Sequence, residues 1–528
     1  MMSPAGRTTA LLFLFFQSVY ALASSGNAFR VPDEFEVYFQ VEHLVDAGDL
    51  SVPQTLAVRQ PVVVNGRVVG TQPIFFGKFG RDGKPYAPYG PAAAFLLVPH
   101  HAAARVVAWV AGIPRAPLPD GTAWVVLVGG LTMIASATAA ALAVAGFHRA
   151  ALSLGAAPRV ALTVSLLLGG ATILWTYGTT LYGEAWQAAA FVWAAALLLD
   201  ARAGARQARF EVIAAAVLLA IAGLTKVTSL VFAPGFVVAA LVDRSAPMRR
   251  RLDAATCLAL GIALAVAVHV AWNLHRFGAP FDFGYDWGET IPRPPARAFD
   301  AGDLPRGLVV LLLSPGKSLF LWAPALVLAL SRLPAFWRRE RAGAIGLAVS
   351  AGAGLIFFGA YLFPEGGYCH GPRHLLPIVP LLLLPAAEPG LTALRRSRVV
   401  ACATIGLAMA LLSTAVSFLE DQSVGEDLAG GARLSYYERI DPAPGRAWNR
   451  YRIGYVPFAG TLSSGRWLSA ETLGSGPDVF PLHMAQARRL LPDGGTIPRW
   501  AIWGPSMGWM LLAAAAGLAL RRKPRAMS

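Results

Sequence analysis

Cysteine is scarce in this chain of 528 residues, and its three copies lie far apart. Cys257 and Cys402 fall inside apolar runs, and only Cys369 lies in a polar segment. This arrangement implies no disulfide framework, so the cysteines do not indicate a redox compartment. The chain also lacks an internal repeat and an Asp-x-Asp motif.

Charged residues make up only 14% of the chain and hydrophobic residues 55%, with a mean hydropathy of +0.52. Long apolar runs of this kind are not needed by a soluble core and indicate an integral membrane protein. The formal charge of +15 would suit a nucleic-acid partner, but the arginines form short clusters between apolar runs. Positive-inside membrane topology explains these clusters better, so no nucleic acid is expected.

Thirteen apolar windows have roughly the length of a membrane segment. They are 8–24, 91–112, 122–147, 159–177, 184–200, 210–224, 227–242, 252–275, 307–330, 343–363, 374–390, 399–418 and 503–520. Arg-rich linkers between them are expected in the cytoplasm, and the charge-balanced linkers outside. The outer stretches are then 25–90, 178–184, 276–303, 364–373 and 419–502.

One window breaks this alternation, because two apolar windows lie between the outer loop 25–90 and the inner Arg149. The weaker of the two is 91–112, which contains Pro99, His100 and Arg105. We predict that it lies in or dips into the outer interface as an interfacial helix. The expected fold is an all-α polytopic bundle of about 12 (11–13) transmembrane helices.

The first outer loop, 25–90, is predicted to be ordered. A helix is expected over 33–46, lying along the membrane surface with an apolar side and a polar side. The Asn65-Gly66 pair predicts a tight hairpin, and Asp82-Gly83 a second turn. The window 8–24 is expected to be retained as the first helix, although Ala21-Leu22-Ala23 also resembles a signal-peptide cleavage site.

The rest of the chain divides into three parts in this interpretation. Residues 1–418 form the transmembrane catalytic module, and 419–502 form a small extracytoplasmic cap that is rich in Gly, Pro and aromatic residues. Residues 503–528 supply the last transmembrane helix and a basic cytoplasmic tail.

Asp33 and Glu34 are adjacent carboxylates a few residues after the first apolar window. Charges beside a bilayer are usually paired, bound to a cation or engaged in proton chemistry, so a functional site is the default hypothesis. Glu36 follows Asp33 at capping-box spacing, and Asp33 as a simple helix cap is an equally strong and compatible alternative.

Further polar candidates fall on the deduced outer face, and each also has a purely structural explanation. Glu184 begins an apolar window, where it also suits the positive end of a helix. Lysines near helix ends either contact phosphate or merely extend to the interface. Arg373 is a better candidate, as a phosphate ligand, than a zinc site in the same loop, because its planar guanidinium stays charged and can pair with two phosphate oxygens. A zinc site at Cys369, His370 and His374 lacks any standard spacing. The candidate substrate-binding residues are Lys84, Tyr86, Tyr89, Lys317, His370, Arg373 and His374.

The ordered set of motifs resembles the GT-C superfamily of polyprenyl-phosphate-sugar-dependent glycosyltransferases, which includes protein O-mannosyltransferases and lipid A aminoarabinose transferases. The resemblance runs from about residue 8 to 390. Its motifs are Pro32-Asp33-Glu34, Lys84 to Pro91 (KPYAPYGP), Asn273 to Tyr285 (NLHRFGAPFDFGY), Ser314 to Pro324 (SPGKSLFLWAP) and Gly366 to Pro377 (GGYCHGPRHLLP).

The resemblance implies an inverting transfer of a sugar from a polyprenyl-phosphate donor to an extracytoplasmic glycan, lipid or protein. It makes Asp33 the catalytic base, with Glu34 supporting the acceptor or a metal and Glu184 near the same pocket. If a divalent cation such as Mg or Mn takes part, these three carboxylates would hold it. The implied location is the outer face of a bacterial-type cytoplasmic (inner) membrane. A polytopic transporter or lipid flippase without sugar transfer is the competing hypothesis, although the apolar spans show few of the polar breaks that transporters use.

Overall fold

The computed structural model describes residues 3–24, 32–64, 67–73, 75–116, 121–204, 208–285, 298–314, 316–361, 364, 366, 369–388, 391, 394–415, 484–485, 488 and 496–521. Almost all of the predicted cap, 419–502, lies outside these residues. The first half of the chain contains the helices α1 (Pro4–Ala23), α2 (Pro32–Ala47), α3 (Pro91–Val110), α4 (Thr122–Trp124), α5 (Gly130–Thr132), α6 (Ile134–Ser153), α7 (Pro158–Gly170), α8 (Leu174–Gly178), α9 (Glu184–Arg202), α10 (Ala208–Thr225), α11 (Pro234–Val242) and α12 (Met248–Phe277). The second half contains α13 (Leu304–Leu312), α14 (Leu319–Trp322), α15 (Leu326–Arg339), α16 (Arg341–Gly359), α17 (Val379–Leu382), α18 (Arg396–Ala415) and α24 (Arg499–Arg521).

The structure confirms the predicted class, an all-α multi-pass membrane protein. Seven described helical segments are long and apolar enough to cross a bilayer, and further apolar helices are shorter. The seven are Pro91–Val110, Thr122–Ser153, Ala208–Thr225, Met248–Phe277, Arg341–Gly359, Arg396–Thr414 and Arg499–Arg521. By length and composition, these seven of the predicted windows remain the strongest candidates for membrane crossings.

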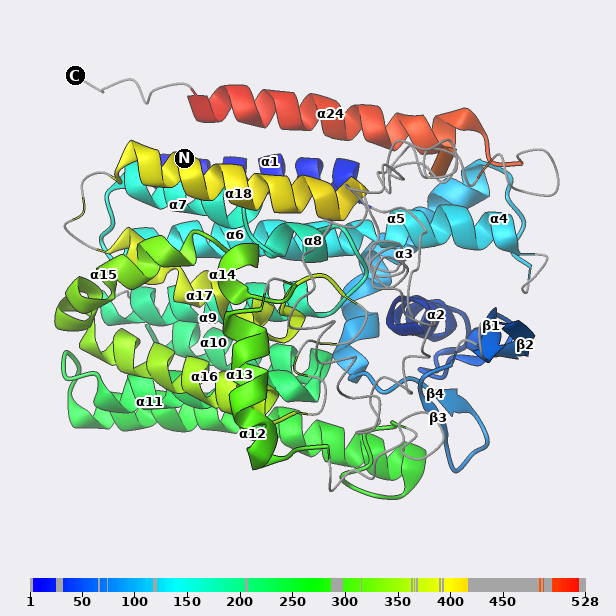
Figure 1. Cartoon of the computed structure of the whole chain (residues 1–528), viewed down its shortest axis with the longest axis horizontal. Helices are drawn as coiled ribbons and strands as arrows, with labels where there is room; N and C mark the ends of the chain where they lie inside the picture. The colour runs from blue at the N-terminus through cyan, green and yellow to red at the C-terminus, as the bar shows by residue number, and fades with distance from the viewer. Residues whose placement is uncertain are drawn as a thin grey trace.

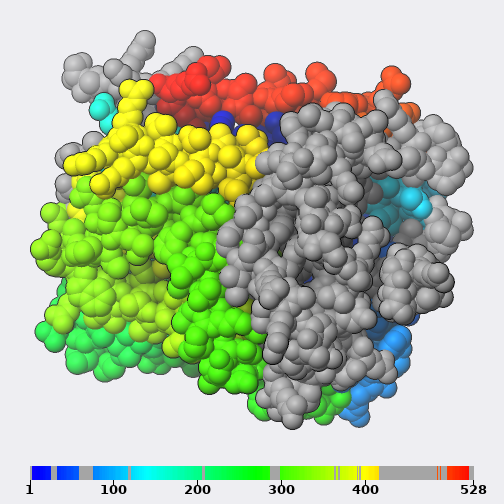
Figure 2. All heavy atoms as spheres, viewed as in Figure 1, coloured from blue at the N-terminus to red at the C-terminus, as the bar shows by residue number. Residues whose placement is uncertain are grey.

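The continuous segment Thr122–Ser153, which ends in α6, is the centre of the bundle. About 83% of its membrane-length window is buried, against 22% for α24 and 28% for α18. Figure 2 shows α18 (yellow) and α24 (red) along one edge of the face in view. The alanine side chains of α6 are small, so neighbouring helices can approach its backbone closely, as small residues allow in membrane bundles. A Cβ atom at Gly178 of α8 would come within 2.7 Å of Ala140.

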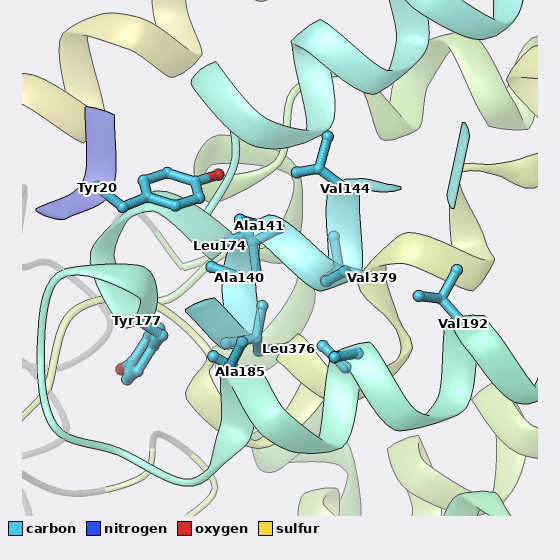
Figure 3. Packing of buried hydrophobic residues seen from close by; sticks show 14 of the residues in the cluster. Tyr20, Ala140, Ala141, Val144, Leu174, Tyr177, Ala185, Val192, Leu376 and Val379 are labelled. Carbon is cyan, nitrogen blue, oxygen red and sulfur yellow. The ribbon is translucent and has the colours of Figure 1, made fainter. Parts of the chain in front are cut away.

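The core forms where α1, α6, α8, α9 and the segment around α17 meet (Figure 3). Tyr20 of α1 is fully buried there, and its hydroxyl donates to the Gly169 carbonyl at 2.7 Å. Ala140 and Ala141 of α6 lie among larger neighbours, which include Leu376 and Val379 (Figure 3). The window 8–24 is therefore a packed member of the bundle.

The described part of the predicted outer loop 25–90 contains a helix and two hairpins, as predicted. Strands β1 (Arg59–Val64) and β2 (Arg67–Pro73) pair antiparallel, with Val64 opposite Arg67, which confirms the hairpin. Strands β3 (Lys78–Phe79) and β4 (Pro85–Tyr86) pair around the second turn, where Gly83 has a φ of +76°. Both hairpins and α2 lie at one end of the bundle (Figure 1). The last turn of α12 reaches this loop, because Arg276 donates to the Ala87 carbonyl at 2.7 Å.

Helix α2 forms where predicted, but the expectation that its polar side faces water is wrong, and its position along the membrane surface stays a prediction. Its apolar side is buried, as at Val37 and Val41, yet Glu36 and Gln40 on the polar side are also fully buried. The chain from residue 75 onward covers this side, and the N–H groups of Phe76 and Gly77 donate to Glu36. The amphipathic pattern of α2 predicted that water would solvate this side, but backbone N–H groups of another segment hydrogen-bond to it instead.

Helix α3 has the length and composition of a membrane span, with 33% of its window buried. In Figure 1 it runs steeply across the direction of α6, α9 and α12, at the end of the bundle that carries α2. Pro99 lies within it and His101 is fully buried, with Nδ1 3.2 Å from the Thr132 hydroxyl. Its interfacial position stays a prediction.

Two predicted windows are interrupted helices. The window 307–330 breaks after α13 and resumes as α14 and α15, and the sequence Pro315-Gly316 lies between α13 and α14. Helix α14 has only four residues, so its N-terminus offers few backbone donors for a phosphate beside Lys317. The window 374–390 consists of short 3₁₀ and α segments between Arg373 and Ala387.

Thiol labelling of single cysteines tests the topology. Arg149 pairs with Asp200 at 2.8 Å, and Arg202 ends α9, so both lie a helix length from Glu184. In a cysteine-free background, a membrane-impermeant reagent added outside should modify position 184 but not 149, 202 or 523. The reverse pattern at 149 and 184 would contradict the orientation.

Candidate active site

Two carboxylates and two cations meet at the end of the bundle that carries α2. Arg373 Nη1 lies 3.3 Å from Asp33 Oδ1, and Arg373 Nε lies 3.9 Å from Glu184 Oε1. Lys226 Nζ lies 3.1 Å from the same Glu184 oxygen. The Asp33 side chain is 21% exposed, whereas Glu184 is 3% and Arg373 11% exposed. Asp33 is therefore the most accessible member of this charge-balanced set.

The four side chains come from four separate helix ends. Asp33 lies in the first turn of α2, and Glu184 is the first residue of α9. Lys226 follows the last residue of α10, and Arg373 begins a 3₁₀ segment. Carboxylates near helix N-termini are favoured by the helix dipole, so both acids have a local as well as an ionic reason for their position.

The charge of Asp33 is set by its surroundings. Burial would raise the pKa of Asp33, but the charges of Arg373 and Lys226 oppose this effect, and so do the hydrogen bond from Arg373 and the nearby Tyr89 hydroxyl. Together they hold the pKa of the Asp33 carboxyl below its usual value. Asp33 is thus ionised at neutral pH and able to accept a proton.

Two tyrosines line the same set of charges. The guanidinium carbon of Arg373 lies 4.9 Å from the ring centroid of Tyr182, a cation–π distance. Tyr89, which leads into α3, is buried beside Asp33 and Glu36. The structure therefore brings Tyr89 to Asp33, together with the predicted Glu184 and Arg373.

Glu34 and Lys317 are buried nearby and hold the chain in place. Glu34 Oε1 accepts a hydrogen bond from the Leu181 N–H at 3.0 Å, which ties α2 to the segment before Glu184. The Lys317 ammonium donates to the Cys369 carbonyl and lies 3.5 Å from its sulfur. Both contacts fix the segments that carry Glu184 and Arg373; direct roles in substrate binding stay predictions.

The structure places the other predicted residues outside this set. Lys84 is largely exposed and pairs with Asp49 at 2.6 Å, and the Tyr86 hydroxyl donates to Asp82 at 2.8 Å. His374 stacks on Phe358, with ring centroids 4.6 Å apart. His370 packs at 5.4 Å from Trp322. None of these contacts tests a role in substrate binding.

Metal ligands do not converge within the part of the chain that the structure describes. No group there contains three or more His, Cys, Asp or Glu side chains able to hold an ion. Asp33 and Glu184 share Arg373 instead, and Glu34 contacts a backbone N–H. The residues present therefore do not fit the three-carboxylate cation site or the zinc site that the sequence suggested.

Sequence reasoning missed Lys226, Tyr182 and Glu36. Lys226 stands alone between two apolar windows, and the alternation of arginine clusters would have placed it on the outer side. Glu36 was assigned to a solvated helix side, although its spacing puts it one turn from Asp33 on the same side of α2. Tyr182 precedes Glu184 by two residues, but nothing in its pattern indicates an arginine partner.

Glu36 should make the stability of the protein pH-dependent. Burial raises the pKa of Glu36 to about 8 against the effect of its two N–H donors, and the Asp33 charge adds to the rise. Its stabilising contribution is therefore complete below the ordinary pKa of 4.5 and is lost as the pH rises through about 8. Glu36→Gln keeps an acceptor oxygen and should remove this loss. We expect the difference in unfolding temperature between the variant and the parent to increase from pH 5 to pH 9. Unfolding temperatures that change in parallel with pH for the two proteins would contradict this prediction.

The chain is thus a multi-pass helical membrane protein with a buried ionic site at one end of its bundle. No protein-family model and no curated protein matches it.

Its fold is similar to that of ArnT from Cupriavidus metallidurans, at 18% identity over 97% of this chain and 77% of ArnT. The TM-score is 0.47 for the apo state and 0.48 for the form bound to undecaprenyl phosphate. It is also similar to the archaeal oligosaccharyltransferase AglB from Archaeoglobus fulgidus in complex with an inhibitory peptide and a dolichol-phosphate (TM-score 0.45, 13% identity, 87% of this chain and 56% of AglB). At these identities and TM-scores the likeness assigns no activity to this chain, so its activity and substrates are proposals.

Proposed function

We propose that this protein is an inverting glycosyltransferase that moves a sugar from a polyprenyl-phosphate donor to an extracytoplasmic acceptor. The reaction would take place at the outer face of a bacterial-type cytoplasmic membrane. The observation that carries the proposal is the pairing of Asp33, ionised and partly exposed, with the buried Arg373 at 3.3 Å. A base and a phosphate ligand are thereby adjacent at one end of a membrane bundle.

The charges define a role for each group. The acceptor hydroxyl gives its proton to the Asp33 carboxylate while its oxygen forms a bond to the anomeric carbon. The bond from that carbon to the phosphate oxygen breaks, and the electron pair leaves with the polyprenyl phosphate. Attack opposite the leaving group inverts the configuration. The phosphate gains one negative charge, which Arg373 can stabilise, with Lys226 nearby.

Glu184 and Glu34 act as positioning residues in this mechanism. Glu184 lies between Arg373 and Lys226 and keeps both cations near Asp33. Glu34 holds the chain just before Glu184. Because protein charges are fixed before the donor arrives, little reorganisation is needed as charge moves from the hydroxyl to the phosphate.

Incubation of the purified protein with radiolabelled polyprenyl-phosphate sugars tests the proposal. We expect label to appear in an acceptor from a membrane extract, with inverted anomeric configuration, for at least one donor in a panel. A transporter or flippase would instead move labelled lipid across reconstituted vesicles without breaking the sugar–phosphate bond. That outcome would overturn the proposal in favour of transport.

A further inference from the structure

A cavity of about 600 Å³ lies at the opposite end of the bundle from Asp33. It is bordered by α9, α10, α11, α12 and α16. Helix α9 begins at Glu184 in the ionic site and reaches the cavity at Arg202. Its 19 residues therefore separate the two sites by about 28 Å, roughly the thickness of the hydrocarbon core.

The inner walls of this cavity are apolar and continue onto the lipid-facing surface. Leu199, Ile213, Phe236 and Leu347 contribute to the lining. Ile213 of α10 is 45% exposed, and Phe210 on the same helix is 67% exposed. Hydrocarbon could therefore enter from the bilayer along α10 without crossing a polar barrier.

The rim of the cavity is positively charged. Arg202, Arg209, Arg250 and Arg251 line it, and they outnumber its acids, Asp243, Asp253 and Glu340. Arg202 is paired with Asp243 at 2.6 Å and with Glu340 at 3.2 Å. Arg251 donates to the Leu241 carbonyl.

Two of these arginines are available for a ligand. Among the described residues, Arg209 and Arg250 form no ion pair and both are exposed. They lie in the first turns of α10 and α12, whose N-terminal N–H groups add positive potential at the rim. No side chain caps the start of α12. The rim thus complements an anion, while the interior complements hydrocarbon.

We propose that this cavity binds an anionic glycerophospholipid. Its phosphate would meet Arg209 and Arg250 at the rim, and its acyl chains would lie against Ile213 and Phe236. A free phosphate would leave these apolar walls in contact with water. A zwitterionic lipid would gain less binding free energy from the two unpaired arginines than an anionic lipid. The arginine-rich linkers place this end in the cytoplasm, so the lipid would come from the inner leaflet. The proposal does not depend on the glycosyltransferase assignment.

Lipid-dependent stability tests the site in the full-length protein. After delipidation in a zwitterionic detergent, mixed micelles containing phosphatidylglycerol should raise the unfolding temperature by about 3 °C or more. Phosphatidylcholine at the same concentration should have little effect. Native mass spectrometry should detect one phosphatidylglycerol retained on each protein molecule.

The variant Arg209→Ala/Arg250→Ala should lose most of the phosphatidylglycerol shift. The matched control is Arg244→Ala/Arg249→Ala, which removes two exposed arginines of the same loop region that do not line the cavity. This control should keep the shift. Equal losses in the two double variants would show non-specific attraction to the anionic surface and overturn the proposal.

Gly343→Leu tests the interior independently of charge. Gly343 lines the cavity, and a Cβ there would meet only Phe336 Cζ, at an ordinary 3.8 Å. The variant should keep its lipid-free unfolding temperature and lose the retained lipid. An equal shift with inorganic phosphate alone would indicate a simple anion site, and a larger shift with undecaprenyl phosphate would indicate a polyprenyl site. Either result would overturn the assignment to a glycerophospholipid.

Discussion

Replacement of Asp33 by Asn is expected to lower the rate of sugar transfer about 10²-fold or more while the protein stays folded. Asn keeps most of the shape of Asp and part of its capacity to accept hydrogen bonds at the start of α2. It cannot take up a proton from an acceptor hydroxyl. The measurement is the turnover of radiolabelled donor at saturating concentration, with the unfolding temperature recorded for the same preparation.

Asp282→Asn is the matched control for this experiment. Asp282 also lies in a stretch predicted to be outside, is 22% exposed against 21% for Asp33, and forms an ion pair with a cation, Lys78. Its replacement should leave turnover near that of the parent. If the Asp33→Asn variant is well folded and keeps nearly full turnover, Asp33 is not the base, whatever the control shows.

The parts of the fold that the sequence predicted are those fixed by local patterns. Most apolar windows form helices, because a backbone in hydrocarbon must satisfy its own hydrogen bonds. The strands that flank Asn65-Gly66 and Asp82-Gly83 in the sequence pair antiparallel, as predicted. The side of α2 that faces solvent could not be predicted in this way, because its cover comes from residues about forty positions later.

The residues of the site also divide into those that local patterns predicted and those that only tertiary packing brings together. Asp33, Glu184 and Arg373 were each selected because a charge stood at a deduced outer helix end, and topology alone brings such ends to one face. Their particular pairing depends on tertiary packing, so neither Lys226 nor Tyr182 was expected. Lys84 stood in the same motif as Tyr89, yet the turn at Gly83 directs it to Asp49 instead.

Arg373→Ala is expected to raise the KM for the polyprenyl-phosphate donor by about 10- to 100-fold, since a charged hydrogen bond contributes about 1.5–3 kcal/mol. Arg373→Lys keeps the charge but loses the planar fork, and it should lie between the parent and the alanine variant. Donor titrations with acceptor held constant measure the effect. An unchanged KM in Arg373→Ala would place the phosphate site elsewhere.

Two further measurements separate phosphate binding from a merely structural effect of Arg373. The control Arg276→Lys alters another buried arginine, which stacks at 4.9 Å on Trp272, and should lower stability without raising the donor KM. The second is the pH profile. Arg373 is the strongest influence that lowers the pKa of Asp33, so its removal leaves burial to raise that pKa. Because the base must be ionised, Arg373→Ala should lose more of its kcat/KM at pH 5 than at pH 8. A uniform loss across this range would show that Arg373 does not control the charge of Asp33, and the base and the phosphate ligand would then have to be treated as separate sites.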